Sequence, residues 1–380
     1  MLKDDEGQAK MVPLATLLEK DSLTASDMAG LLSLHDKSEV RRLYNKAYAV
    51  KRECVGTTVY FRGLIEISNL CEKNCYYCGI RRENGSVERY MMDETDILDA
   101  AGEAWKWGYG SVVLQSGEVS GDHYARFIER IILKIKKLFH GELGITLSLG
   151  EQDEDAYRRW RQAGAHRYLL RIETSDRRLY STLHPEDHSY DRRIECLSLL
   201  KTIGYQVGTG VMIGLPGQTV EQLAQDILFY KRIDADMIGM GPYIPHHGTP
   251  LAKSMPDFDN VKAEQLDLSL RMIAVTRIVL RDVNIASTTA LQAIEDSGRE
   301  LGLKAGANVI MPNITPLAYR TRYELYDNKP CLDENEATCR DCLEARIESI
   351  GETIGYGRMG DSPHFKNRIT RERFAQPAAE

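Results

Sequence analysis

The stretch VYFRGLIEISNLCEKNCYYC, residues 59–78, joins a run of apolar residues to three closely spaced cysteines. Its first ten residues predict a buried β-strand, because aliphatic and aromatic side chains are favoured in strands. From this point onward, apolar segments alternate with helical patterns, which predicts a parallel sheet covered by helices. We expect eight strands, at residues 59–68, 111–117, 144–150, 167–174, 207–215, 237–244, 284–290 and 307–312.

Eight strand–helix units over about 250 residues predict a complete (β/α)8 TIM-type barrel, with a doubly wound open sheet as the second choice. The α/β barrel is expected at residues 51–315. We expect an N-terminal helical extension at 1–50 and a C-terminal extension at 316–380, whose last residues, 369–380, look like a loose tail. In such a barrel the chemistry lies at the carboxyl ends of the strands.

Charge and hydropathy exclude several classes of protein. The chain of 380 residues carries a formal net charge of -7, which argues against nucleic-acid binding, since phosphate contacts need a basic surface. It has no apolar run long enough to span a membrane, and its polar N-terminus lacks a signal core. A cytoplasmic protein is therefore expected.

The cysteines of the opening stretch, Cys71, Cys75 and Cys78, have CxxxCxxC spacing. Structural zinc sites and iron–sulfur clusters both usually take four protein ligands. With neither a fourth cysteine nor a histidine nearby, the trio predicts a metal centre with one open coordination position. The alternatives are a zinc loop completed by a distant residue and a chance surface cluster.

Polar side chains also follow other predicted strands. Arg171 and Glu173 alternate with apolar residues, so both can face one barrel mouth, and a buried charged pair is costly unless it is used. The hydroxyls of Thr146, Thr288 and Thr289 suit a small polar or anionic ligand, although β-branched filling of the strands explains them equally well.

A second cysteine group, Cys331, Cys339 and Cys342, follows the last predicted strand with Cx7CxxC spacing. It predicts an auxiliary iron–sulfur cluster or a zinc site near the surface, away from the first group. Cys54 and Cys196 are isolated and are expected to be packed thiols.

The three-cysteine loop resembles that of the radical S-adenosylmethionine (radical SAM) enzymes, which carry an aromatic residue before the third cysteine, here Tyr77. The resemblance implies that Cys71, Cys75 and Cys78 hold a [4Fe–4S] cluster whose fourth iron binds SAM. One electron from such a cluster cleaves SAM to methionine and a 5′-deoxyadenosyl radical.

Seven segments in order resemble the HydE family, the radical SAM maturases of [FeFe]-hydrogenase in the biotin synthase-like branch, across roughly residues 45–350. They are GLIEISNLCEKNCYYCGIRRENG, VVLQSGE, TLSLGE, RYLLRIET, GLPGQT, GPYIPH and GANVIMPN. The resemblance implies SAM contacts from Tyr77, Ser116, Gly117, Glu118, Glu173 and Arg193. It implies a substrate or anion cavity lined by Arg62, Gln115, Thr146, Arg171, Thr288, Thr289 and Tyr319.

The family further implies a role in assembling the diiron subsite of the hydrogenase H-cluster. Its expected partners are an iron-complex or other small-molecule substrate, other hydrogenase maturases, and a reductant such as ferredoxin or flavodoxin. The alternatives are a methylornithine synthase-like or biotin synthase-like enzyme acting on a small amino-acid or sulfur-containing substrate. A non-catalytic metal-binding or electron-transfer protein would leave the Arg171–Glu173 pair unexplained.

Overall fold

The structure, a computed structural model, describes residues 12–332 and 336–375. Its centre is a parallel sheet in which eight strands follow one another as β10-β1-β2-β3-β4-β5-β7-β9. These strands are β1 (Thr58–Ser68), β2 (Ser111–Ser116), β3 (Gly144–Ser148), β4 (Arg167–Leu169), β5 (Gln206–Thr209), β7 (Met237–Ile238), β9 (Asn284–Ile285) and β10 (Val309–Ile310). All eight predicted strands are confirmed. The order has no reversal, so the doubly wound sheet is wrong and the fold is a partial TIM-like barrel.

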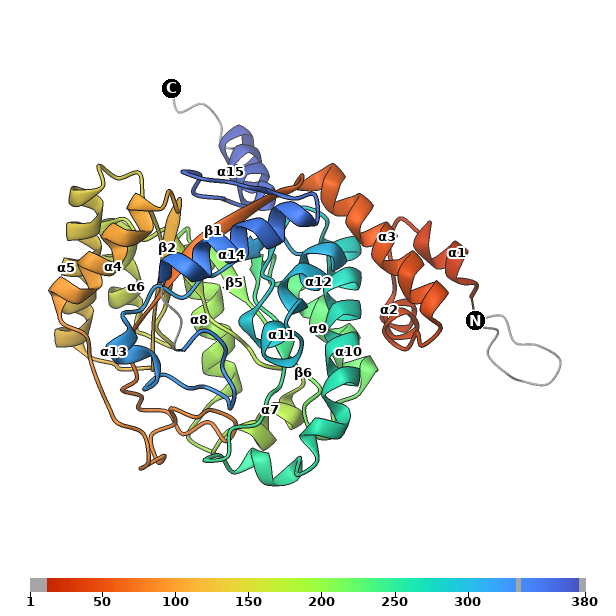
Figure 1. The fold of residues 1–380 in the computed structure, drawn as a ribbon, viewed down its shortest axis with the longest axis horizontal. Helices are drawn as coiled ribbons and strands as arrows, with labels where there is room; N and C mark the ends of the chain where they lie inside the picture. Colours follow the sequence, from red (N-terminus) through yellow and green to blue (C-terminus); the bar gives the residue numbers. More distant parts are fainter. Residues whose placement is uncertain (1–11, 333–335, 376–380) are drawn as a thin grey trace.

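Helices follow the strands and cover the outside of the sheet. In Figure 1, α4 and α5 lie on one side of it and α10 and α12 on the other. These outer helices are α4 (Glu94–Lys106), α5 (Asp122–Leu138), α6 (Glu154–Ala163), α8 (Tyr190–Thr202), α9 (Val220–Arg232), α10 (Phe258–Leu280) and α12 (Gly298–Ala305). In α5, for example, Ile128, Ile131, Ile132 and Ile135 are fully buried at helical spacing, which gives the helix one core-facing side.

Shorter elements surround the carboxyl ends of the strands. The extended segments after β5 and β7 break into separate short strands that pair with each other, so the predicted strands there were too long. The short elements are β6 (Met212–Ile213), β8 (Gly241–Pro242), α7 (Arg177–Leu183), η1 (Leu251–Ser254), α11 (Thr289–Ile294) and α13 (Leu317–Arg320). Of these elements, β6, β8 and α11 contribute residues to the cavity described below.

The N-terminal helices pack against the barrel helices, with α3 beside α10 and α2 beside α9. They are α1 (Leu14–Leu18), α2 (Ala25–Leu32) and α3 (Lys37–Cys54). Lys51 of α3 forms an ion pair of 2.9 Å with Glu352, and both side chains are fully buried. No helix among residues 12–332 and 336–375 is long and apolar enough to cross a membrane.

The C-terminal segment covers the amino ends of the strands. It contains α14 (Glu336–Ser349), β11 (Thr353–Ile354), which pairs with the start of β1, and α15 (Pro363–Ala375). The predicted loose tail is wrong up to residue 375, because residues 369–375 belong to α15. Arg368, just before them in the same helix, forms ion pairs with Asp234, at 3.0 Å, and Asp236, at 2.7 Å. The remaining residues of that tail, 376–380, lie outside the described part of the chain.

Candidate active site

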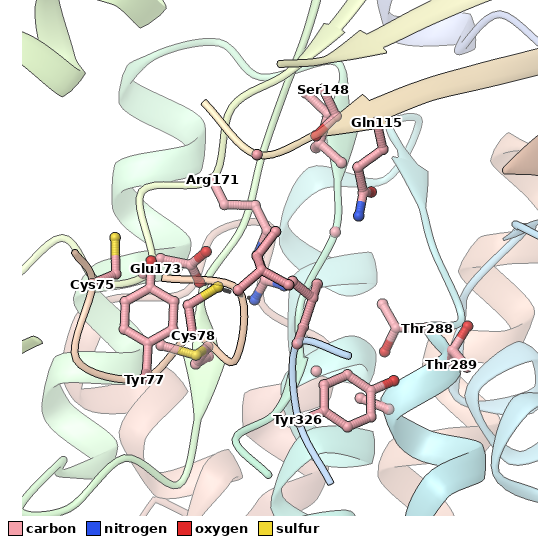
Figure 2. Close-up of a pocket in the computed structure, with 18 of the residues that line it drawn as sticks. Cys75, Tyr77, Cys78, Gln115, Ser148, Arg171, Glu173, Thr288, Thr289 and Tyr326 are labelled. Carbon is pink, nitrogen blue, oxygen red and sulfur yellow. Dashed lines mark ion pairs between the residues drawn. The ribbon is translucent and has the colours of Figure 1, made fainter. Parts of the chain in front are cut away.

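A cavity of about 330 Å³ opens at the carboxyl ends of the strands. In Figure 2, Cys75 and Cys78 lie at one side of it, with Gln115, Thr288 and Thr289 at the other. Most of the sequence-predicted site residues line this cavity. They are Cys71, Cys75, Tyr77, Cys78, Gln115, Ser116, Gly117, Glu118, Arg171, Glu173, Arg193, Thr288 and Thr289.

The cysteine loop that follows β1 is held by backbone hydrogen bonds to distant segments. The amide of Tyr76 donates to the Leu183 carbonyl, at 2.9 Å, and the amide of Gly79 donates to the Leu325 carbonyl, at 3.0 Å. Burial raises the pKa of Cys75 to about 12. A buried thiol of this kind needs a metal cation to become a thiolate, and so it suits a metal centre.

The spacing of the three sulfur atoms argues against a single zinc ion. Among the described residues, the three potential metal ligands whose ligand atoms all lie within 4.8 Å of one another are His246, His247 and Asp327, and not the three cysteines. At least two of the three cysteine sulfurs therefore lie more than 4.8 Å apart. Two sulfurs on one zinc, each at about 2.3 Å, lie at most about 4.6 Å apart. In addition, no fourth cysteine of the described residues lines the cavity, so the trio fits a polynuclear cluster with one open position.

The His246 group is better explained as loop structure. The amide of Gly248 donates to Nδ1 of His246, at 3.0 Å, and His247 Nδ1 lies 2.8 Å from an oxygen of Asp327. With its Nδ1 accepting, a neutral His246 carries the proton on Nε2, which leaves no lone pair there for a metal.

In Figure 2, Tyr77 lies between Cys75 and Cys78, and its hydroxyl is 3.4 Å from Nε2 of His184. His184 in turn lies 2.9 Å, through Nδ1, from the carbonyl of Tyr180. Tyr77 is thus oriented by α7, a helix that the sequence patterns did not reveal.

The turn after β2 brings Gly117 and Glu118 against the cysteine loop. A Cβ on Gly117 would lie 2.2 Å from the oxygen of Leu70 and 2.8 Å from the Cβ of Cys71, so no larger residue fits this approach. The carboxylate of Glu118 pairs with Lys73 at 3.2 Å. Burial raises the pKa of Glu118 above its usual range.

The predicted pair at the end of β4 is present, because Arg171 and Glu173 form an ion pair of 3.1 Å that faces the cavity. Glu173 is 7 % exposed and adopts a left-handed backbone with φ of 65°. A non-glycine residue in this conformation stores strain, which is typical of functional positions. Burial raises the pKa of Glu173, with the positive charges of Arg171 and Arg193 acting in the opposite direction.

Arg193 reaches the cavity from α8. Its Nε donates to Glu151 at 2.6 Å and its Nη1 donates to the carbonyl of Arg171 at 2.6 Å. Glu151 also pairs with Lys73, at 3.1 Å. Neither Glu151 nor Lys73 was predicted from the sequence. For Lys73, the available signal was its position between the predicted cluster ligands Cys71 and Cys75.

The other end of the cavity is polar. Gln115 donates to the hydroxyl of Tyr323, at 3.2 Å, and Tyr326 also lines this end. A buried ion pair of 2.5 Å joins Glu66 of β1 to Lys329. Among these residues only Gln115 was predicted. Glu66, a charged residue inside the apolar strand 59–68, was an overlooked signal of a functional position.

Three predicted cavity residues lie elsewhere. Arg62 and Thr146 line a separate void of about 20 Å³. Each of them pairs with the first residue of a neighbouring strand, Arg62 with Ser111 of β2 and Thr146 with Arg167 of β4. Both therefore lie nearer the amino ends of the strands. Tyr319 is in α13, where its hydroxyl donates to a carboxylate oxygen of Asp96, at 2.5 Å. These three residues are not among those that line the larger cavity, and their role toward the substrate stays a prediction.

The remaining cysteines give a mixed picture. Cys196 is fully buried, as expected for a packed thiol, and Cys54 is partly buried. Cys331 is partly buried and adopts φ of 65°, but the side chains of Cys339 and Cys342 lie outside the described part of the chain. The second metal site stays a prediction.

Comparison with known proteins connects this geometry to a family. The radical SAM superfamily matches residues 65–230. The [FeFe] hydrogenase maturase subunit HydE of Thermotoga maritima is 44% identical over 340 residues, 89% of this chain and 94% of that protein. The 3-methylornithine synthase of Methanosarcina barkeri is 27% identical over 88% of this chain and 91% of that protein.

Two solved structures share the fold. Methylornithine synthase superposes with a TM-score of 0.76 at 25% identity, covering 90% of this chain and 97% of that one. HydG, a maturase of the [FeFe]-hydrogenase, has a TM-score of 0.76 at 18% identity, covering 94% of this chain and 79% of that one, which is a likeness of fold alone.

Proposed function

This chain belongs to the HydE family of [FeFe]-hydrogenase maturases, and from that membership we propose that it acts in assembling the diiron subsite of the hydrogenase H-cluster. The family binds a [4Fe–4S] cluster and SAM. When bound, the cluster supplies the electron that cleaves SAM to methionine and a 5′-deoxyadenosyl radical. One observation carries the proposal: three partly buried cysteines, without a fourth among the described lining residues, face a cavity that also holds fixed charges of both signs.

The residues divide the cavity into two ends. Cys71, Cys75 and Cys78 would hold the cluster, and Glu118 and Arg193 would bind the ammonium and carboxylate groups of SAM. In a buried site such charge-assisted contacts are strong and fix the orientation of the ligand. Tyr77, Ser116, Gly117 and Glu173 would complete the SAM contacts, the glycine by allowing close backbone approach.

The polar end would hold the substrate. Gln115, Arg171, Thr288 and Thr289 present amide, guanidinium and hydroxyl groups to this space. From the resemblance to the HydE family we infer a low-molecular-weight iron species carrying CO, cyanide and cysteine as the substrate. The donors at this end of the cavity would suit a small anionic complex. Exclusion of bulk water would protect a carbon radical formed beside it.

We also propose that the barrel around this site is closed and that the protein works with other proteins. Residues 51–315 would form the catalytic barrel. Closure between its end strands is supported by the bridge Ala286–Val309 and by the Ser287 amide, which donates to the Val309 carbonyl at 2.8 Å.

Other hydrogenase maturases are the expected partners, with a ferredoxin or flavodoxin as reductant. The described cysteines form no disulfide, which fits the reducing cytoplasm.

A methylornithine synthase-like activity is the second candidate, because the M. barkeri enzyme matches 88% of this chain and the solved synthase shares the fold. A biotin synthase-like activity would need further cysteines at the strand ends for a sacrificial cluster. Among the described lining residues the cysteines are Cys71, Cys75 and Cys78 alone, which speaks against it.

The deciding experiment is maturation of [FeFe]-hydrogenase in vitro, with and without this protein, in a mixture that contains the other maturases. We expect hydrogen evolution to require the reconstituted protein and to fail with Cys75→Ala. Hydrogen evolution of equal rate without the protein would contradict the role. Formation of 3-methylornithine by the same preparation would support the second candidate instead.

A further inference from the structure

Glu151 connects four parts of the site. Its carboxylate accepts a hydrogen bond from Nε of Arg193, at 2.6 Å, and pairs with Lys73, at 3.1 Å. Its backbone amide donates to a carboxylate oxygen of Glu118, at 2.8 Å. Through this one residue, the loop after β3 is joined to α8, to the cysteine loop and to the turn after β2. Glu151 itself is 8 % exposed.

The site faces an electrostatic problem that these contacts solve. The amino-acid end of SAM carries an ammonium and a carboxylate, so its receptor must present one anion and one cation a fixed distance apart. Glu118 and Arg193 have those charges, but opposite charges in a buried cavity attract each other strongly and would tend to pair directly. Such a pair would leave neither group available to the ligand.

In the structure each group has another partner. Arg193 is paired with Glu151, at 2.6 Å, while Glu118 is paired with Lys73, at 3.2 Å. Lys73 also contacts Glu151, so the four side chains form a chain of alternating charge. Burial opposes ionisation of Glu151, but Arg193 and Lys73 outweigh it and hold its pKa below the usual value.

We propose that Glu151, together with Lys73, is a positioning residue that keeps Glu118 and Arg193 apart and oriented for the amino-acid end of SAM. The proposal rests on the proposed function, in which this cavity binds SAM. Because Lys73 lies between Cys71 and Cys75, the same pair fixes the SAM-binding charges relative to the cluster loop. Glu151 touches the two binding residues and acts through them.

The test separates the two ends of the ligand. Reconstituted wild-type protein and Glu151→Gln are titrated with SAM and with 5′-methylthioadenosine, which keeps the adenosine but lacks the amino-acid moiety. Iron and sulfide content are measured in each preparation. Glu154→Gln is the matched control, since Glu154 pairs with Arg158 on the exposed side of α6.

We expect Glu151→Gln to keep its iron and sulfide and its affinity for methylthioadenosine, and to lose about tenfold or more in affinity for SAM. Equal weakening of both ligands would show a general structural role and overturn the proposal, as would unchanged affinity for SAM. Lys73→Met should show the same selectivity if the pair acts together. Failure of the wild type to bind SAM would instead contradict the proposed function.

Discussion

The backbone amide of Glu118 donates a hydrogen bond to the sulfur of Cys71, with nitrogen and sulfur 3.4 Å apart. This contact joins the end of β2 to the first cysteine of the loop that follows β1. It depends on Gly117, because only a residue without a side chain allows the two segments to approach so closely. The geometry of the cysteine loop is therefore set partly by a neighbouring strand.

Replacement of Gly117 tests this dependence. In Gly117→Ala the new Cβ would lie 2.2 Å from a backbone oxygen, so the cysteine loop must move. We expect lower iron and sulfide content after anaerobic reconstitution. Gly85→Ala is the matched control in the same loop region, since nothing lies within 4 Å of its added Cβ. Full iron content in Gly117→Ala would show that the loop tolerates displacement.

The cysteines should separate by role. We expect Cys71→Ala, Cys75→Ala and Cys78→Ala, each made in a Cys331→Ala background that removes the second predicted site, to abolish the iron–sulfur absorbance of the reconstituted protein, because three thiolates are the fewest that hold a [4Fe–4S] cluster with one open iron. Cys54→Ala, in α3, should leave it intact. Absorbance that survives loss of any one of the three would assign that cysteine to packing.

Asp226 predicts a pH dependence of stability. It is fully buried, its Oδ1 accepts from the amide and hydroxyl of Ser175, at 2.7 Å and 2.6 Å, and burial raises its pKa to about 7. An unfolded aspartate titrates near pH 4, so between about pH 4 and 7 the folded state holds more protons and its stability falls as pH rises.

Asp226→Asn removes that ionisation and keeps the oxygen acceptor. We expect it to increase the free energy of unfolding by about 2 kcal/mol at about pH 8, with a smaller gain at about pH 5. Urea unfolding of the metal-free protein measures the difference, with the exposed Asp259→Asn as control. A gain that is equal at both pH values would show that the carboxyl is not the titrating group.

Helix α15 should stabilise the barrel through Arg368. Asp236 is fully buried and pairs with Arg368 at 2.7 Å, so removing the cation leaves a poorly compensated charge. We expect Arg368→Gln to lower the free energy of unfolding by about 2 kcal/mol. Lys366→Gln, an exposed change on the same helix, should be neutral. Equal unfolding curves for both variants would mean that α15 contributes little.

Local patterns in the sequence predicted the framework of the molecule well. The apolar run of residues 59–68 and the spacing of Cys71, Cys75 and Cys78 are properties of short segments, and both the strand and the loop facing the cavity are present. Arg171 and Glu173 were found in the same way, because a charged pair in an apolar strand is conspicuous within a few residues.

Features that depend on long-range placement were missed. Strand alternation tells which side of the sheet Arg62 and Thr146 face, but their height along the strand follows from register with neighbouring strands. Helix α15 is held by Asp236, which lies more than a hundred residues earlier in the chain. Tyr323 and Tyr326 reach the cavity from an irregular segment that carries no periodic signal.

The central claim is that three protein thiolates hold a cluster whose remaining iron binds SAM directly. Electron–nuclear double resonance on the reduced, reconstituted protein with SAM labelled at its carboxylate oxygens tests this claim. The account predicts hyperfine coupling between the label and the cluster, lost in Cys75→Ala. A cluster that forms fully but shows no coupling to the bound, labelled SAM would contradict it.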